Sequence, residues 1–78
     1  MANASAAIRM ALSKINKKGN FLIESWGKSQ SAVYNKFMRN NWTGKDLASV
    51  AELTGGRLAF VYPDGQQIFI DAVEENED

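Results

Sequence analysis

Hydrophobic residues in the first half of the chain recur every three or four positions, which is the spacing of a helix with one buried side. The first such stripe consists of Ile8, Ala11, Leu12 and Ile15. It predicts a helix that begins at Asn3 or Ser5, since either side chain can cap a helix, and that ends at Lys18. Gly19 follows, and we expect it to take the left-handed conformation that stops many helices.

Two shorter segments continue the helical spacing. The first is predicted to have Asn20 as its cap, to run to Trp26 and to end at Gly27. The second is predicted to have Ser29 as its cap and to end at Arg39. The buried side of this second segment is expected to hold Val33 and Phe37, which lie one helical turn apart.

A fourth helix is predicted after Thr43, because Asp46 three positions later gives the spacing of a capping box. Its apolar residues are Leu47, Val50, Ala51 and Leu53. The sequence Thr-Gly-Gly at residues 54–56 is expected to stop it, since glycine readily ends a helix.

From Arg57 onward the apolar period falls to two, which is the period of a β-strand. The sequence Tyr-Pro-Asp-Gly at residues 62–65 predicts a type I turn with a bulge, because proline fixes φ at the second position and glycine accepts a positive φ at the fourth. This turn sets the register of a hairpin. The pairs that it predicts are Val61–Gln67, Phe60–Ile68, Ala59–Phe69, Leu58–Ile70 and Arg57–Asp71.

The predicted register divides the apolar side chains between the two faces of the hairpin. The face expected to pack on the helices holds Leu58, Phe60, Ile68 and Ile70. The face left outward holds Ala59, Val61, Phe69 and Val73. Because a monomer of this size should not leave such a patch in water, we expect a second copy of the chain to bury it. The alternative is that the acidic tail or the first helix folds back over it.

These elements predict a small α+β domain, with four helices followed by a C-terminal β-hairpin. The expected organisation is a helical region over residues 1–56, a dimerisation hairpin over residues 57–73 and a disordered acidic tail over residues 74–78. The chain has 78 residues and no cysteine, so no disulfide can supplement its small core. Assembly as a homodimer is expected for this reason as well.

The zero net charge of the chain conceals a strong division. Residues 9–45 hold eight Lys or Arg against one acid, Glu24, which gives a net charge of +7. Residues 46–78 hold one base, Arg57, against eight acids, which gives −7. This asymmetry indicates a nucleic-acid partner or charge-complementary assembly. The alternative is solvated surface charge, and charge alone does not favour either.

Several function classes are disfavoured by composition. The chain has no histidine and no cysteine, so it lacks the commonest general base and most zinc ligands. We therefore predict that it is not an enzyme and that it needs no metal or other cofactor. No apolar run approaches the ~20 residues of a membrane span, and no signal-peptide pattern opens the chain, which predicts a cytoplasmic protein.

The segment LIESWGKSQSAVYNKF at residues 22–37 has a glycine at a turn (Gly27), a small helix-capping residue (Ser29) and an aliphatic residue four positions later (Val33). In this pattern it resembles the Cro/CI-type (XRE-like) helix-turn-helix family, and over residues 6–56 the chain is similar to small phage-type members. The resemblance implies that residues 29–39 form a recognition helix for the major groove of DNA. It also implies dimerisation through the hairpin, since Cro-like proteins dimerise through strands.

The chain departs from this family at the start of its second helix. Family members usually carry a Ser/Thr-Gln pair there that contacts phosphate, whereas only Asn20 and Phe21 separate Gly19 from Leu22. The second helix is thus shorter than usual by about three residues. Asn20 and the backbone amides behind it are expected to replace that contact, because helix N-termini attract phosphate.

The candidate contact residues follow from the side chains around the recognition helix. Opposite its buried side it is expected to expose four candidate base-reading residues, Gln30, Ser31, Tyr34 and Asn35. Gln and Asn can bond bidentately to adenine, and Ser can bond to several base edges. Tyr34 is expected either to contact a phosphate or a thymine methyl, or to cover the turn. Phosphate contacts are expected from Asn20, Lys28, Ser29, Lys36, Arg39 and Lys45.

The sequence therefore predicts sequence-specific binding of double-stranded DNA by a homodimeric transcriptional regulator, for example a repressor, of phage or mobile-element type. The alternative is an interaction protein with the same fold that binds and inhibits another protein, such as an antirepressor or a phage-encoded inhibitor of a host defence nuclease. The shortened second helix and the acidic second half of the chain are the features that support this alternative.

Overall fold

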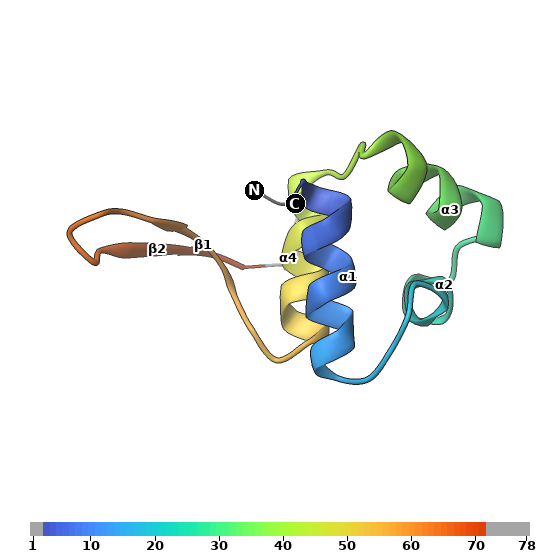
Figure 1. Cartoon of the computed structure of the whole chain (residues 1–78), viewed down its shortest axis with the longest axis horizontal. Coiled ribbons are helices and arrows are strands. Elements are labelled where there is room, and N and C mark those ends of the chain that lie inside the picture. Colours follow the sequence, from blue (N-terminus) through green and yellow to red (C-terminus); the bar gives the residue numbers. More distant parts are fainter. Residues whose placement is uncertain (1–2, 72–78) are drawn as a thin grey trace, which may run out of the picture. The chain divides into compact units, whose positions relative to one another are not determined.

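The computed structural model describes residues 3–71, so Val73 and the acidic residues 74–78 lie outside the described part of the chain. Its elements, in chain order, are α1 (Ala4–Lys14), α2 (Asn20–Trp26), α3 (Gln30–Arg39), α4 (Gly44–Leu53), β1 (Leu58–Val61) and β2 (Gln67–Ile70) (Figure 1). The predicted fold class, α+β with four helices before a hairpin, is confirmed. The chain divides between Trp42 and Thr43 into two compact units. We call residues 3–42 unit 1 and residues 43–71 unit 2.

The start of α1 matches the sequence pattern. The side chain of Asn3 accepts a hydrogen bond from the Ala6 backbone N–H at 2.8 Å, which satisfies one of the free donors of the first turn. Asn3 rather than Ser5 is therefore the cap. Ser5 is instead a buried residue within the helix.

The end of α1 differs from the prediction. The helix ends at Lys14, and Asn16 rather than Gly19 takes the left-handed conformation, with φ +61°. The Lys17 N–H donates to the Leu12 carbonyl at 3.0 Å, and the Asn16 N–H donates to the Ser13 carbonyl at 3.0 Å. These two bonds form a Schellman motif, which stops the helix four residues before the predicted end at Lys18.

The start of α2 also corrects a prediction. Asn20 is the first helical residue and not the cap, and the N-cap position, Gly19, supplies no side-chain bond. The amides of Phe21 and Leu22 donate to the carbonyls of Lys18 and Gly19, at 2.9 and 3.0 Å. A tight turn of backbone bonds therefore opens this helix, and those two amides are already used.

The turn between α2 and α3 and the limits of α3 are as predicted. Gly27 ends α2 in the left-handed region, with φ +64°. The Ser29 hydroxyl accepts from the Ala32 N–H at 3.1 Å and caps α3. Asn40, with φ +54°, ends α3. A short polar side chain at that position lowers the cost of a left-handed backbone.

The core of unit 1 comes from its three helices. α3 packs against both α1 and α2. The buried apolar residues of unit 1 are Ile8, Leu12, Leu22, Val33 and Phe37. The predicted buried pair on α3, Val33 and Phe37, is therefore confirmed.

A buried hydroxyl ties α1 to the segment after α3. The Ser5 Oγ donates to the Phe37 carbonyl at 2.8 Å and accepts from the Trp42 indole N–H at 2.9 Å. The Trp42 ring meets the Phe37 ring edge to face, with centroids 4.7 Å apart. Trp42 thus combines an apolar contact with a satisfied N–H, as a partly buried indole requires.

In unit 2, α4 begins with the predicted capping box. The Thr43 Oγ1 accepts from the Asp46 N–H, and the Asp46 carboxylate accepts from the Thr43 N–H, each at 3.0 Å. The buried residues of α4 are Ala48 and Val50. The predicted apolar stripe omitted Ala48 and included Leu53, which is exposed because it lies on the last turn of the helix.

The hairpin has the predicted register. The four pairs are Leu58–Ile70, Ala59–Phe69, Phe60–Ile68 and Val61–Gln67. The turn is closed by the Gly65 N–H bonding to the Tyr62 carbonyl at 2.9 Å and by the Tyr62 N–H bonding to the Gln66 carbonyl at 3.0 Å. Gly65 has φ +93°, the conformation that the bulge requires.

The packing of the hairpin differs from the prediction. β1 contacts α4, yet only Leu58 and Ala59 are half-buried, and the strands project away from α4 in Figure 1. On the face expected to cover the helices, Phe60 is 58% exposed and Ile68 is 46% exposed. Within unit 2, α4 therefore leaves Phe60 and Ile68 uncovered. The register is set locally by the turn, whereas covering a face needs a neighbour that the turn does not supply.

Candidate nucleic-acid interface

The candidate interface begins with the way α2 presents α3. The two helices are joined by residues 27–29, and Figure 1 shows α2 nearly end-on while α3 runs across the view. Their axes therefore cross steeply, as in helix-turn-helix units. The turn is fixed by the left-handed Gly27 and by the Lys28 N–H, which donates to the Ile23 carbonyl at 3.3 Å. The backbone conformation of Gly27 and the hydrogen bond of Lys28 thus set the position of α3 relative to α2.

Three of the four candidate base-reading residues lie together. Gln30, Ser31 and Tyr34 line one open depression with Ser29, and all of them are exposed. Tyr34 is 60% exposed and lines this depression beside Ser29, so its side chain is accessible next to the turn. Asn35 is exposed on the next position of the helix, outside this depression. These side chains form an exposed polar surface along α3, and Gln30 and Tyr34 lie at the edge of that surface next to Val33.

One residue on this side of α3 was not predicted. Met38 is 62% exposed and follows Tyr34 by four positions, so it lies one turn further along the same side. A thioether chain offers apolar contact, of the kind that recognises a thymine methyl group. The four-residue spacing from Tyr34 is the sequence signal that points to it.

The candidate phosphate contacts do not all gather on one surface. Lys28 and Arg39 are exposed at the two ends of α3, on either side of the base-reading residues. Lys36 is half-buried and already has an interaction with another group. It follows Tyr34 by two residues, about 200° round the helix. Lys45 belongs to α4 in unit 2.

The two polar candidates for phosphate contact differ in how much their side chains are already used. Ser29 uses its hydroxyl oxygen to cap α3. Asn20 is exposed and lines a groove between α2 and α3 that also includes Gln30 and Tyr34. Asn20 therefore lies close to Gln30 and Tyr34 of α3. The amides behind it, at Phe21 and Leu22, are bonded to carbonyls and have no free N–H for a phosphate.

The electrostatics of the two units differ in sign. Unit 1 holds seven Lys or Arg and one acid, Glu24, so its net charge is +6. Unit 2 holds two bases, Lys45 and Arg57, against four acids, which gives −2. The basic field therefore surrounds α3, where a polyanion would be attracted.

Along residues 3–71 no helix is both long enough and apolar enough to cross a membrane. Comparisons of the chain with protein-family models, with curated proteins and with solved structures find no match. The assignment of a function therefore depends on the geometry of the chain itself.

Proposed function

We propose that the protein binds double-stranded DNA sequence-specifically, as a regulator related to the Cro/CI-type (XRE-like) helix-turn-helix family. The observation that carries the proposal is the exposed polar surface of α3, on which Gln30, Ser31 and Tyr34 lie together and Asn35 and Met38 extend the row. In this proposal α3 enters the major groove, where amide and hydroxyl groups read base edges. The protein acts in the cytoplasm without catalysis or a cofactor.

The charge of unit 1 supports the same function. Lys28 and Arg39, at the two ends of α3, are placed to neutralise phosphates on either side of the groove. Binding that depends on such contacts weakens as salt rises, because counterions are released when phosphates are neutralised. The proposal therefore includes a steep salt dependence.

The hairpin supports assembly as a homodimer. Both of its faces are exposed, with Phe60 and Ile68 on one and Val61 and Phe69 on the other. The Tyr62–Gln66 bond makes alternate pairs hydrogen-bonded, so the backbone groups of Val61–Gln67 and Ala59–Phe69 point to the two open edges. A second copy can pair with one edge and cover an apolar face.

We assign the covered face to Leu58, Phe60, Ile68 and Ile70. This differs from the face expected from the sequence, which contains Val61 and Phe69. The latter face also carries Arg57, whose guanidinium lies 4.0 Å from the Phe69 ring centroid and 3.1 Å from the Asp71 carboxylate. Burial of that ion pair costs desolvation, whereas the Phe60 face is apolar along both strands. A dimer then presents two copies of α3 to half-sites about 34–36 Å apart.

The second candidate function is binding to another protein. It is favoured by the exposed apolar hairpin in a unit of net negative charge. In that case the hairpin binds the target, and the surface of α3 is an ordinary solvated helix side.

A fluorescence-anisotropy titration separates the two functions. We expect the protein to bind random duplexes at about 50 mM salt and to lose most of this affinity at about 200 mM. A preferred site is then selected from the random pool. On that site Asn35→Ala is expected to cost about 1–3 kcal/mol and to leave random-duplex affinity nearly unchanged. Asn41→Ala, which removes the same side chain from an exposed position outside α3, is the matched control.

Two outcomes would contradict DNA binding. One is the absence of binding to any duplex at low salt, which favours the protein-binding alternative. The other is an equal effect of Asn35→Ala and Asn41→Ala on the selected site, which removes α3 from base recognition.

A further inference from the structure

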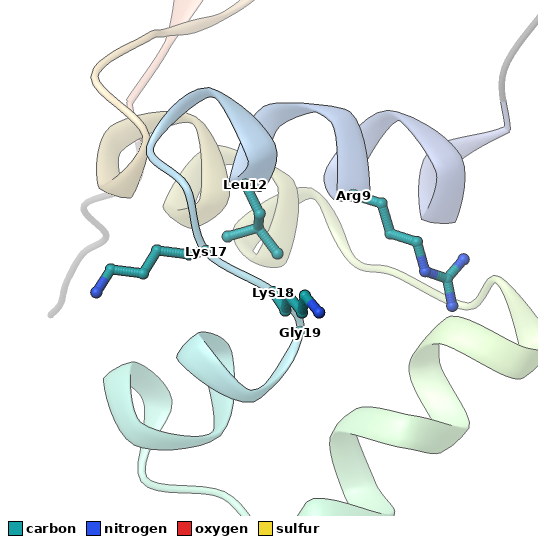
Figure 2. Close-up of a pocket in the computed structure, with 5 residues that line it drawn as sticks. All are labelled: Arg9, Leu12, Lys17, Lys18 and Gly19. Atoms are coloured by element: carbon teal, nitrogen blue, oxygen red, sulfur yellow. The ribbon is translucent and has the colours of Figure 1, made fainter.

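A second basic feature of unit 1 lies outside the surface of α3. It is a pocket between the end of α1 and the start of α2, lined by Arg9, Leu12, Lys17, Lys18 and Gly19 (Figure 2). Three of these five residues are cations. Leu12 is fully buried, and its side chain points from α1 towards Lys18 and Gly19 in Figure 2. The pocket therefore has an apolar floor and a basic rim.

The backbone around the pocket is fixed on both sides. The Schellman motif at the end of α1 holds the Lys17 amide against the Leu12 carbonyl at 3.0 Å. Gly19 packs so closely on Phe37 that a Cβ there would lie 3.1 Å from the Phe37 Cε2. Because of these contacts, the segment that carries Lys17 and Lys18 is held in place even though it is not helical.

In the described part of the chain, residues 3–71, the cations of the rim have no carboxylate partner. The Arg9 guanidinium lies 4.5 Å from the Phe37 ring centroid, and the Lys17 ammonium lies 5.5 Å from that of Phe21. Aromatic faces hold these groups without using their N–H donors or cancelling their charge. Within the described chain none of Arg9, Lys17 and Lys18 forms an ion pair with a carboxylate. The N–H donors of these three side chains are therefore available to bind an anion.

The arrangement of the cations indicates which kind of anion. In Figure 2 the side chains of Arg9 and Lys17 extend in opposite directions from the pocket, and Lys18 lies between them. A single small anion is best held by donors that converge on one point. Cations spread along a rim suit a phosphodiester strand, since successive phosphates can meet successive cations.

We propose that this pocket binds the phosphodiester backbone of the duplex that α3 recognises, an inference that rests on the proposed DNA binding. Gly19 lines both this pocket and the groove that reaches Gln30 and Tyr34, so the two features adjoin at Gly19. The pocket takes the place of the contact expected from the amides after Asn20, which are used by carbonyls. Arg9, Lys17 and Lys18 thereby position the duplex while α3 reads it.

The test compares charge removal inside and outside the pocket. Lys18→Gln and Arg9→Gln remove a cation from the rim, and Lys14→Gln removes an exposed cation from the last turn of α1, outside the pocket. Random-duplex affinity is measured for each variant between about 50 and 200 mM salt. The measured quantity is the ratio of the affinity at about 50 mM salt to the affinity at about 200 mM salt. For each phosphate that a variant no longer neutralises, this ratio is expected to be about threefold smaller than in the unsubstituted protein. Lys14→Gln is expected to keep the slope of the unsubstituted protein. Far-UV circular dichroism confirms that each variant is folded.

The outcomes separate the pocket from the function on which it rests. If the unsubstituted protein binds duplexes and the three variants share its salt slope, the pocket assignment is wrong and DNA binding stands. If no duplex binds, the proposed function itself is wrong. A titration with inorganic phosphate, followed through the NMR signals of the Lys18 and Gly19 amides, completes the test. Saturation by phosphate without any duplex binding would overturn the assignment to a phosphodiester strand in favour of a free anion.

Discussion

The two units of the chain use their apolar residues in opposite ways. Unit 1 buries residues from all three of its helices, and Leu12 and Leu22 are 0% exposed. In unit 2 the hairpin has a well-defined register, yet Val61, the last residue of β1, is 68% exposed. In unit 2 the buried apolar residues, Ala48 and Val50, belong to α4. The hairpin of that unit has its local structure set by a turn and by backbone pairing, and most of its side chains are exposed.

The same contrast holds for charge and for polar bonds. Unit 1 is basic and contains the buried hydroxyl of Ser5, which bonds to Phe37 and Trp42. The described part of unit 2 has a net negative charge, and its ion pair, between Arg57 and Asp71, is exposed. A regular strand pairing therefore does not imply a covered strand. In the function that we propose, base recognition belongs to unit 1 and assembly of the dimer to unit 2.

The largest expected effect concerns the open faces of the hairpin. Phe60→Lys combined with Ile68→Lys places two ammonium groups on the face that we assign to the partner copy. Because burial of unpaired charge is strongly unfavourable, dimer affinity should fall by at least about a thousandfold. Sedimentation equilibrium measures this loss. Helical content should be unchanged, since these side chains are exposed in the single chain.

Val61→Lys combined with Phe69→Lys is the matched variant for the opposite face. A smaller loss of dimer is expected there. If this variant loses more dimer affinity than the variant at Phe60 and Ile68, the interface is the face predicted from the sequence, which contains Val61 and Phe69. A protein that is monomeric without any substitution at high micromolar concentration would show that the hairpin is not a dimer interface.

The second prediction compares one apolar truncation in each unit. Leu22→Ala leaves a cavity in unit 1 and should lower the free energy of unfolding by about 2–5 kcal/mol. Ile68→Ala removes a side chain that is 46% exposed and should cost less than about 1 kcal/mol in dilute protein. Urea unfolding, followed by far-UV circular dichroism, which reports on the backbone of both units, gives both values. If both substitutions lower the free energy of unfolding equally in dilute protein, the contrast between the buried core of unit 1 and the exposed hairpin of unit 2 is wrong.

The third prediction tests the polar centre of unit 1. Ser5→Ala removes the donor to the Phe37 carbonyl and the acceptor of the Trp42 N–H, and should cost about 1–3 kcal/mol. Ser13→Ala is the control, because Ser13 is exposed on the same helix and its hydroxyl donates to the Met10 carbonyl of the preceding turn. It should change the free energy of unfolding by less than about 0.5 kcal/mol. Similar values in thermal unfolding would show that the buried hydroxyl is replaceable.

Much of the fold could be predicted because its signals are local. The sequence Tyr-Pro-Asp-Gly at residues 62–65 fixes the hairpin register through dihedral preferences alone. The caps at Ser29 and Thr43 each lie three residues from the amide that they bond, so the sequence contains both partners. The spacing of Val33 and Phe37 likewise predicts the buried side of α3.

The predictions from sequence are wrong where a residue far away in the chain determines the local structure. Both Asn16 and Gly19 can stop α1, and sequence favours glycine, but Gly19 lies against Phe37, a contact that the local pattern does not contain. Ser5 is a residue type that often caps helices. Here its side chain is buried and accepts a hydrogen bond from the Trp42 indole, which lies 37 positions further along the chain. At the candidate site, the pocket that includes Arg9 and Lys18 depends on how α1 ends, so the sequence spacing did not reveal it.

The smallest expected effect compares two glycines at which an added Cβ meets no atom within 4 Å. Gly27 in unit 1 has φ +64°, where any L side chain is strained, so Gly27→Ala should destabilise by about 1 kcal/mol, and Gly27→Asn by less. Gly44 in unit 2 is the first residue of α4. Gly44→Ala should therefore stabilise by about 0.5 kcal/mol, because alanine loses less conformational entropy in a helix. Opposite signs in urea unfolding would trace the effect to backbone conformation rather than to space. A stabilising Gly27→Ala would mean that the turn before α3 is not left-handed, and the presentation of α3 by α2 would then have to be different.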